Sequence, residues 1–188
     1  MRQNKFSLKE GKQLVDLARA AISGDILTTK GFEDKRGIFV TLNSYPGKQL
    51  RGCIGFPEPT FPLREAIIEA ARSAAFKDSR FNPVRKNEKF TVDISVLTEP
   101  ELIEKDPLKS FTIGKHGLIV KHHGNYGLLL PQVFAEWKAT QEQALAMVCE
   151  KAGLDMDSWK KKDCRIYKFE AQVFIEEKPN GKVIEGYA

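Results

Sequence analysis

The chain has 188 residues, of which 41% are hydrophobic and 29% charged, and it carries a formal net charge of +5 at pH 7. These values lie close to the averages of folded soluble proteins, so they exclude a wholly disordered or fibrous chain and predict one domain with its own core. Three cysteines cannot all pair and no apolar run approaches the roughly 20 residues of a membrane span, so we expect a cytoplasmic protein.

The first hundred residues contain signals for a helix and a hairpin. Ser7 followed by Glu10 forms a capping box, and apolar residues recur at helical spacing until Gly24, which predicts a first helix. The runs 38–42 and 50–56 are apolar and β-branched, and turn residues separate them. They predict a β-hairpin.

A second helix and a third strand should follow this hairpin. Thr60 can cap the helix with Pro62 in its first turn, and apolar residues then continue as a stripe to Ala74. Between Phe90 and Val96, apolar and polar residues alternate. This period predicts a strand with one buried and one solvent-exposed face.

The same order of elements returns in the second half. The runs 118–121 and 128–130 flank a turn-rich segment, 122–127, and predict another hairpin. Thr140 and Gln143 form a second capping box before a helix that ends near Gly153, and residues 167–176 alternate as a closing strand.

These elements together predict an α+β fold. Two related β-β-α-β units, about 38–97 and 118–176, would form two lobes of a single domain spanning 1–188, with the first helix as an addition to the scheme. The halves share their order of elements and no visible repeat of residues.

The positive charge is concentrated in the first half of the chain. Residues 101–188 are balanced, so residues 1–100 carry the whole excess, and between Lys48 and Lys89 there are nine basic and five acidic residues. A pocket in this region would attract an anion such as a carboxylate or a phosphate. Ordinary solubility explains the same surplus without any partner.

The segment Leu50-Arg51-Gly52-Cys53-Ile54-Gly55 is the strongest candidate for chemistry. Glycines such as Gly52 and Gly55 inside a strand mark a bulge or a close approach of backbone. Residues two apart on a strand share a face, so Arg51 would lie beside Cys53 and favour its thiolate. The alternative is that Cys53 serves as a small buried hydrophobe. The other cysteines, Cys149 and Cys164, are expected in a helix stripe and at a strand entry.

Two further segments could complete this pocket. Asp78 and Arg80 stand two residues apart in a turn-prone stretch, where Asp78 could instead bond its own backbone. A reactive cysteine usually needs a base, and His122 and His123 are the candidates for Cys53. On an extended segment their side chains would point in opposite directions, so only one of them, His122, could face the pocket. A hairpin tip facing solvent is the alternative position for both.

Metal and nucleic-acid sites have weaker signals. The sequence contains no paired-cysteine spacing, no His-Glu-x-x-His and no acidic cluster with ligand spacing, so we expect no metal site and no cofactor. Gly-x-x-Gly occurs at Gly52 and at Gly114, but the first lies in an extended run and the second precedes a strand, unlike the loop between helices in a KH module. Nucleic acid is therefore a disfavoured partner.

The hexapeptide 50–55 and five further blocks together resemble the AMMECR family. The other blocks follow in the family's order; they are Asp78 with Arg80-Phe81, Ser95 to Thr98, Gly114 to Val120, Leu130 to Val133, and Lys151 to Leu154. The resemblance covers about residues 7–176. It implies an α+β fold with duplicated units, a functional hexapeptide, and, as partners, a Memo-like protein and a radical-SAM protein. It implies no defined reaction.

Two functional hypotheses follow. In the first, the protein belongs to an enzymatic or modification system in which Cys53 reacts, Arg51 activates it or holds an anionic substrate, and Asp78 and Arg80 complete the pocket. In the second, the chain is a non-catalytic module that binds protein or RNA, which the basic first half favours. If the hexapeptide is purely structural, Cys53→Ala should lower stability as an ordinary core truncation does and change nothing else.

Overall fold

The computed structural model describes residues 5–25 and 29–186, and these form two compact units. Unit one comprises the chain up to Leu97 together with Gln172–Gly186, and unit two comprises Thr98–Ala171. All described strand pairs are antiparallel. Helices and antiparallel strands thus combine as the predicted α+β fold, and in the described ranges no helix is long and apolar enough to cross a membrane.

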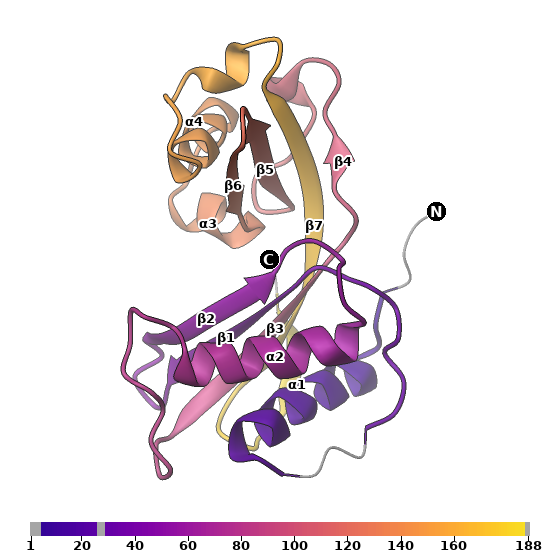
Figure 1. Ribbon diagram of the computed structural model, residues 1–188, viewed down its shortest axis with the longest axis vertical. Helices are drawn as coiled ribbons and strands as arrows, with labels where there is room; N and C mark the ends of the chain where they lie inside the picture. Colours follow the sequence, from indigo (N-terminus) through magenta and orange to yellow (C-terminus); the bar gives the residue numbers. More distant parts are fainter. Residues whose placement is uncertain (1–4, 26–28, 187–188) are drawn as a thin grey trace. The chain divides into compact units, whose positions relative to one another are not determined.

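In unit one, two helices pack on a sheet. The helices are α1 (Leu8–Ser23) and α2 (Leu63–Phe76), and the sheet contains β1 (Ile38–Ser44), β2 (Leu50–Phe56) and β3 (Phe90–Leu97) in the order β2-β1-β3. Figure 1 shows α1 and α2 lying side by side against these strands. The final part of β7 (Arg165–Glu176) and β8 (Val183–Gly186) also belong here and pair with each other.

Alternate strand residues supply the core beneath the helices. Ile38, Val40 and Leu42 of β1 and Val92 and Ile94 of β3 are fully buried against α1 and α2. The residues between them therefore lie on the opposite face of the sheet. Glu176, the last residue of β7, has a buried carboxylate that accepts hydrogen bonds from the side chain of Arg19. It also accepts from the backbone N–H of Val92 at 3.0 Å and from that of Asn180 at 2.7 Å.

In unit two, two further helices pack on a second group of strands. Its strands are β4 (Glu101–Leu102), β5 (His116–His122), β6 (Asn125–Leu129) and the first part of β7, and β5 lies between β6 and β7. Its helices are α3 (Pro131–Glu136) and α4 (Gln141–Lys151), with the 3₁₀ turns η1 (Pro107–Lys109) and η2 (Ser158–Lys160). The core includes Leu118, Val120, Phe134, Leu145 and Cys149.

The structure confirms both capping boxes and both hairpins and corrects several details. Thr60 does not cap α2, because its hydroxyl donates to the carbonyl of Glu58 and Pro62 occupies the N-cap. The predicted exposed face of β3 is wrong, since Thr91 and Ser95 are buried. The second turn is shorter than predicted, with only His123 and Gly124 between β5 and β6. α3 was not predicted, because its six residues are too few to show a helical period.

Candidate functional site

Gly52 fixes the direction in which the side chain of Cys53 points. A Cβ atom at Gly52 would lie 2.2 Å from the carbonyl oxygen of Ala74 in α2, so only glycine permits this approach of strand and helix. Gly52 is buried against α2, so the next residue, Cys53, lies on the face away from α2. The register between β1 and β2 shifts at Arg51, which has no partner on β1, so strand alternation alone does not place its side chain beside that of Cys53.

The thiol of Cys53 lies in a row of polar residues that crosses the sheet. Thr41 of β1 is opposite Cys53 on one side and opposite Asp93 of β3 on the other. The hydroxyl of Thr41 donates to Sγ of Cys53 at 3.3 Å, and the thiol is half-buried. Cys53 is therefore neither sealed in an apolar core nor fully exposed.

Asp78 and Arg80 cover the free edge of β2 at Cys53. The backbone N–H of Cys53 donates to Oδ2 of Asp78 at 2.9 Å, and Nη2 of Arg80 donates to the carbonyl oxygen of Cys53 at 3.1 Å. Arg80 and Asp78 also form an ion pair at 2.7 Å. The hydrogen bonds from Arg80 hold the pKa of Asp78 well below its ordinary value of 3.8, and the same contact raises the pKa of Arg80.

Arg51 has a different partner from the predicted one. Its Nε and Nη2 donate to the two carboxylate oxygens of Glu88, the latter at 3.2 Å, and this contact holds the pKa of Glu88 below its ordinary value. The guanidinium that contacts the backbone of Cys53 is that of Arg80. Nη1 of Arg51 is buried and has no hydrogen-bond partner among the described residues.

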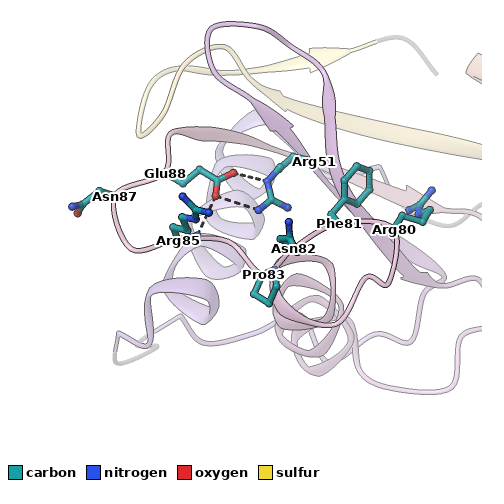
Figure 2. Close-up of a pocket in the computed structure, with 8 residues that line it drawn as sticks. All are labelled: Arg51, Arg80, Phe81, Asn82, Pro83, Arg85, Asn87 and Glu88. Atoms are coloured by element: carbon teal, nitrogen blue, oxygen red, sulfur yellow. Dashed lines mark hydrogen bonds and ion pairs between the residues drawn. The ribbon is translucent and has the colours of Figure 1, made fainter.

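A pocket of about 630 Å³ opens beside Arg51. Figure 2 shows Arg51, which comes from β2, across from the loop that joins α2 to β3. The lining combines three arginines with one carboxylate and two amides, and consists of Arg51, Arg80, Phe81, Asn82, Pro83, Arg85, Asn87 and Glu88. Its volume lies in the range of small-molecule sites, roughly 300–1,000 Å³, and its charge is positive.

Asp93 is a site residue that the sequence reasoning did not single out. Burial raises its pKa to about 6, and Asn43 donates to its Oδ2 at 2.8 Å, while its Oδ1 is buried without a partner among the described residues. The signal in the sequence was an acidic residue inside a strand that is otherwise apolar, threonine or serine. A carboxyl group with a pKa near 6 can accept a proton at neutral pH.

The two remaining predicted residues, Gly55 and His122, have surroundings of their own. Gly55 packs closely against β1, where a Cβ would lie 2.3 Å from the carbonyl oxygen of Ile38. His122 belongs to unit two and is buried at the end of β5, where its ring centroid lies 4.2 Å from that of His123. The two imidazoles do not point in opposite directions as an extended segment would require, because His123 has a positive φ of 46°.

Groups that could hold a metal occur in unit two. His122, His123 and Asp163 offer ligand atoms that all lie within 4.8 Å of one another. The thiols of Cys149 and Cys164 are less suitable, because burial raises the pKa of both, that of Cys164 to about 11.

Comparisons with known proteins agree over most of the chain. Residues 13–174 match the AMMECR1 family model. The chain is 48% identical over 197 residues to a protein of Methanopyrus kandleri and 47% identical over 194 residues to one of Methanocaldococcus jannaschii, with at least 95% of each chain covered. A solved structure, described as an uncharacterised protein from Pyrococcus horikoshii, is 43% identical, covers 96% of this chain and 98% of its own, and superimposes with a TM-score of 0.87.

Proposed function

The chain belongs to the AMMECR1 family, and for this member we propose that the pocket beside Arg51 binds a small anionic substrate of an enzymatic or modification system. The observation that carries the proposal is the buried Nη1 of Arg51, which has no acceptor among the described residues. A buried donor without a partner costs about 1–3 kcal/mol, and an anionic oxygen in the pocket would remove that cost.

The surroundings of Arg51 support an anion over a neutral ligand. Arg80 and Arg85 line the same pocket and are exposed, whereas Glu88 is its only acidic lining residue. The backbone N–H of Arg85 donates to Glu88 at 3.1 Å, so Glu88 orders both Arg51 and the loop. Arginine side chains hold carboxylates and phosphates through paired N–H donors.

Titration calorimetry with inorganic phosphate and inorganic pyrophosphate tests this proposal. Arg85→Ala should weaken binding at least about tenfold, because a hydrogen bond to a charged group contributes roughly 1.5–3 kcal/mol. The matched control is Lys86→Ala, which removes an exposed charge from the next position but leaves the pocket lining unchanged. Absence of saturable binding, or equal weakening in both variants, would contradict the proposal.

A second candidate function, reaction at Cys53, has its own support. The thiol is half-buried, accepts a hydrogen bond from Thr41, and lies on a residue whose carbonyl oxygen contacts Arg80. Arg80 therefore connects the pocket with the thiol-bearing residue.

Alkylation by iodoacetamide, followed for each cysteine by peptide mass spectrometry, tests this candidate. We expect Cys53 to react faster at neutral pH than Cys149 and Cys164, and Arg80→Gln to slow its reaction. A rate for Cys53 no faster than those of Cys149 and Cys164, and unchanged in Arg80→Gln, would leave Cys53 a structural residue.

A further inference from the structure

The turn between β5 and β6 places two imidazole rings side by side. His123 and Gly124 form a two-residue turn with φ values of 46° and 81°, as in the type I′ turns that join tight hairpins. This left-handed conformation turns His123 away from the alternation of the strand, so its ring lies 4.2 Å from that of His122 between centroids. The positive φ of His123 brings this pair together, and residue spacing alone does not predict it.

A carboxylate completes the cluster. Asp163 lies shortly before β7, and its Oδ2 is 2.8 Å from Nε2 of His123, while its Oδ1 is 3.8 Å from Nδ1 of His122. The carboxylate of Asp163 is solvent-exposed and its two oxygens face the two imidazoles, so it is placed to act as a ligand.

The buried nitrogen of His122 points to a ligand. The side chain of His122 is only 6% exposed, yet its Nδ1 has no hydrogen-bond partner within the described part of the chain. This atom faces Asp163, and all three residues line a hollow of about 420 Å³. Buried nitrogens of this kind are normally satisfied by a protein group, a water or a metal ion.

We propose that His122, His123 and Asp163 form a binding site for a divalent transition-metal cation, with Zn²⁺ as the best match. Imidazole nitrogen and carboxylate oxygen are both Zn²⁺ ligands, at about 2.0–2.2 Å, so two ligands of one ion are at most about 4 Å apart. The two separations that involve Asp163, 2.8 Å and 3.8 Å, satisfy this limit. Three protein ligands leave a fourth position for water or a further ligand.

Two basic residues line the same hollow and bear on the choice of cation. The ammonium group of Lys121 lies 5.5 Å from the ring centroid of Tyr126 and 5.7 Å from that of Tyr167. Lys121 precedes His122 on β5, and successive strand residues point to opposite faces. Arg165 is exposed. Nearby positive charge opposes any divalent cation, so the choice rests on the ligands: two imidazole nitrogens and one carboxylate disfavour Mg²⁺ and Ca²⁺, which prefer all-oxygen ligand sets.

The proposed metal site is independent of the anion pocket, because its three residues all belong to unit two. The experiment uses the untagged full chain, reduced, treated with EDTA and dialysed, and titrated with Zn²⁺ by calorimetry. We expect one ion per chain. His123→Asn should weaken binding at least about tenfold, since loss even of a group that orients a ligand costs that much. Asn followed by Gly is the preferred type I′ pair, so this variant retains the turn.

Matched variants separate this site from other Zn²⁺ ligands. Asp163→Asn should also weaken binding, whereas Asp155→Asn, at an exposed position of the same unit, and Cys164→Ser should bind like the wild type. Co²⁺ should give the visible absorption of a nitrogen and oxygen site without a thiolate charge-transfer band. Absence of saturable binding, or equal affinity in His123→Asn and the wild type, would overturn the proposal and leave a histidine–aspartate ion pair.

Discussion

Asp78 and Cys53 are 25 positions apart in the sequence and are joined by a 2.9 Å hydrogen bond from the backbone N–H of Cys53 to the carboxylate of Asp78. Asp78 is buried, and Arg80 is its ion-pair partner. One carboxylate thus connects the hexapeptide strand with the loop that lines the pocket beside Arg51. Its charge should affect stability as well as the site.

Replacing Asp78 by Asn should lower the free energy of unfolding at pH 7 by about 1.5–3 kcal/mol, because hydrogen bonds to a charged group are lost. The pKa of Asp78 is lowered in the folded protein, so its contribution is complete above the ordinary value of 3.8 and is lost as pH falls below it. Urea unfolding from pH 7 to pH 2 should show that the free energies of unfolding of the wild type and Asp78→Asn converge in acid. A difference in stability that does not change with pH would contradict this prediction.

Replacing Asp93 by Asn should have the opposite pH dependence. Burial raises the pKa of Asp93 to about 6, so the folded state favours the neutral carboxyl group, and stability is lost as pH rises from about 4 through 6. The free energy of unfolding of Asp93→Asn, relative to that of the wild type, should rise by up to about 3 kcal/mol between pH 4 and pH 8. Unfolding curves at pH 4 and pH 8 measure this change. The same difference in stability between the two proteins at both pH values would refute the prediction.

Replacing Gly52 by Ala should destabilise unit one. The added methyl group would lie 2.2 Å from the carbonyl oxygen of Ala74, and the backbone of α2 must move to admit it. Overpacking of this kind costs about 1–3 kcal/mol. Gly47→Ala is the control, because its Cβ would meet only the hydroxyl of Ser44 at 3.3 Å. Denaturant unfolding compares the two, and similar midpoints would show that the strand can shift.

Replacing Glu176 by Gln should lower the free energy of unfolding by more than replacing Gly52 by Ala does. The buried carboxylate holds Arg19 and two backbone N–H groups, so neutralising it leaves the largely buried guanidinium without its counter-charge. Breaking a buried pair in this way costs roughly 3–5 kcal/mol. Glu177→Gln, at the adjacent exposed position, should change stability by less than about 0.5 kcal/mol. Thermal unfolding of both variants measures the contrast.

Local signals predicted most of the elements. Ser7 and Thr140 both form the capping boxes expected of them. The sequence pattern does not predict α3, because a short helix shows no period. It also does not predict Pro62 as the N-cap of α2, because the position of a cap depends on the path of the preceding loop.

The partners of the site residues were harder to predict. Strand alternation predicts Arg51 beside Cys53, but the register shifts at Arg51, and its ion pair with Glu88 spans 37 positions and depends on how the loop folds back. Thr41 lies beside Cys53, and Asp93 beside Thr41, only through the strand register. The approach of His123 to His122 depends on a positive φ, which a histidine adopts only in a particular turn.

The cover that Asp78 and Arg80 provide also has a consequence for association between chains. β2 is the edge strand of its sheet, and an edge strand with unoccupied N–H and C=O groups is a template for the addition of a strand from another molecule. At Cys53 both groups are already bonded. Side chains from the same chain thus protect the thiol-bearing stretch from intermolecular β-pairing and aggregation.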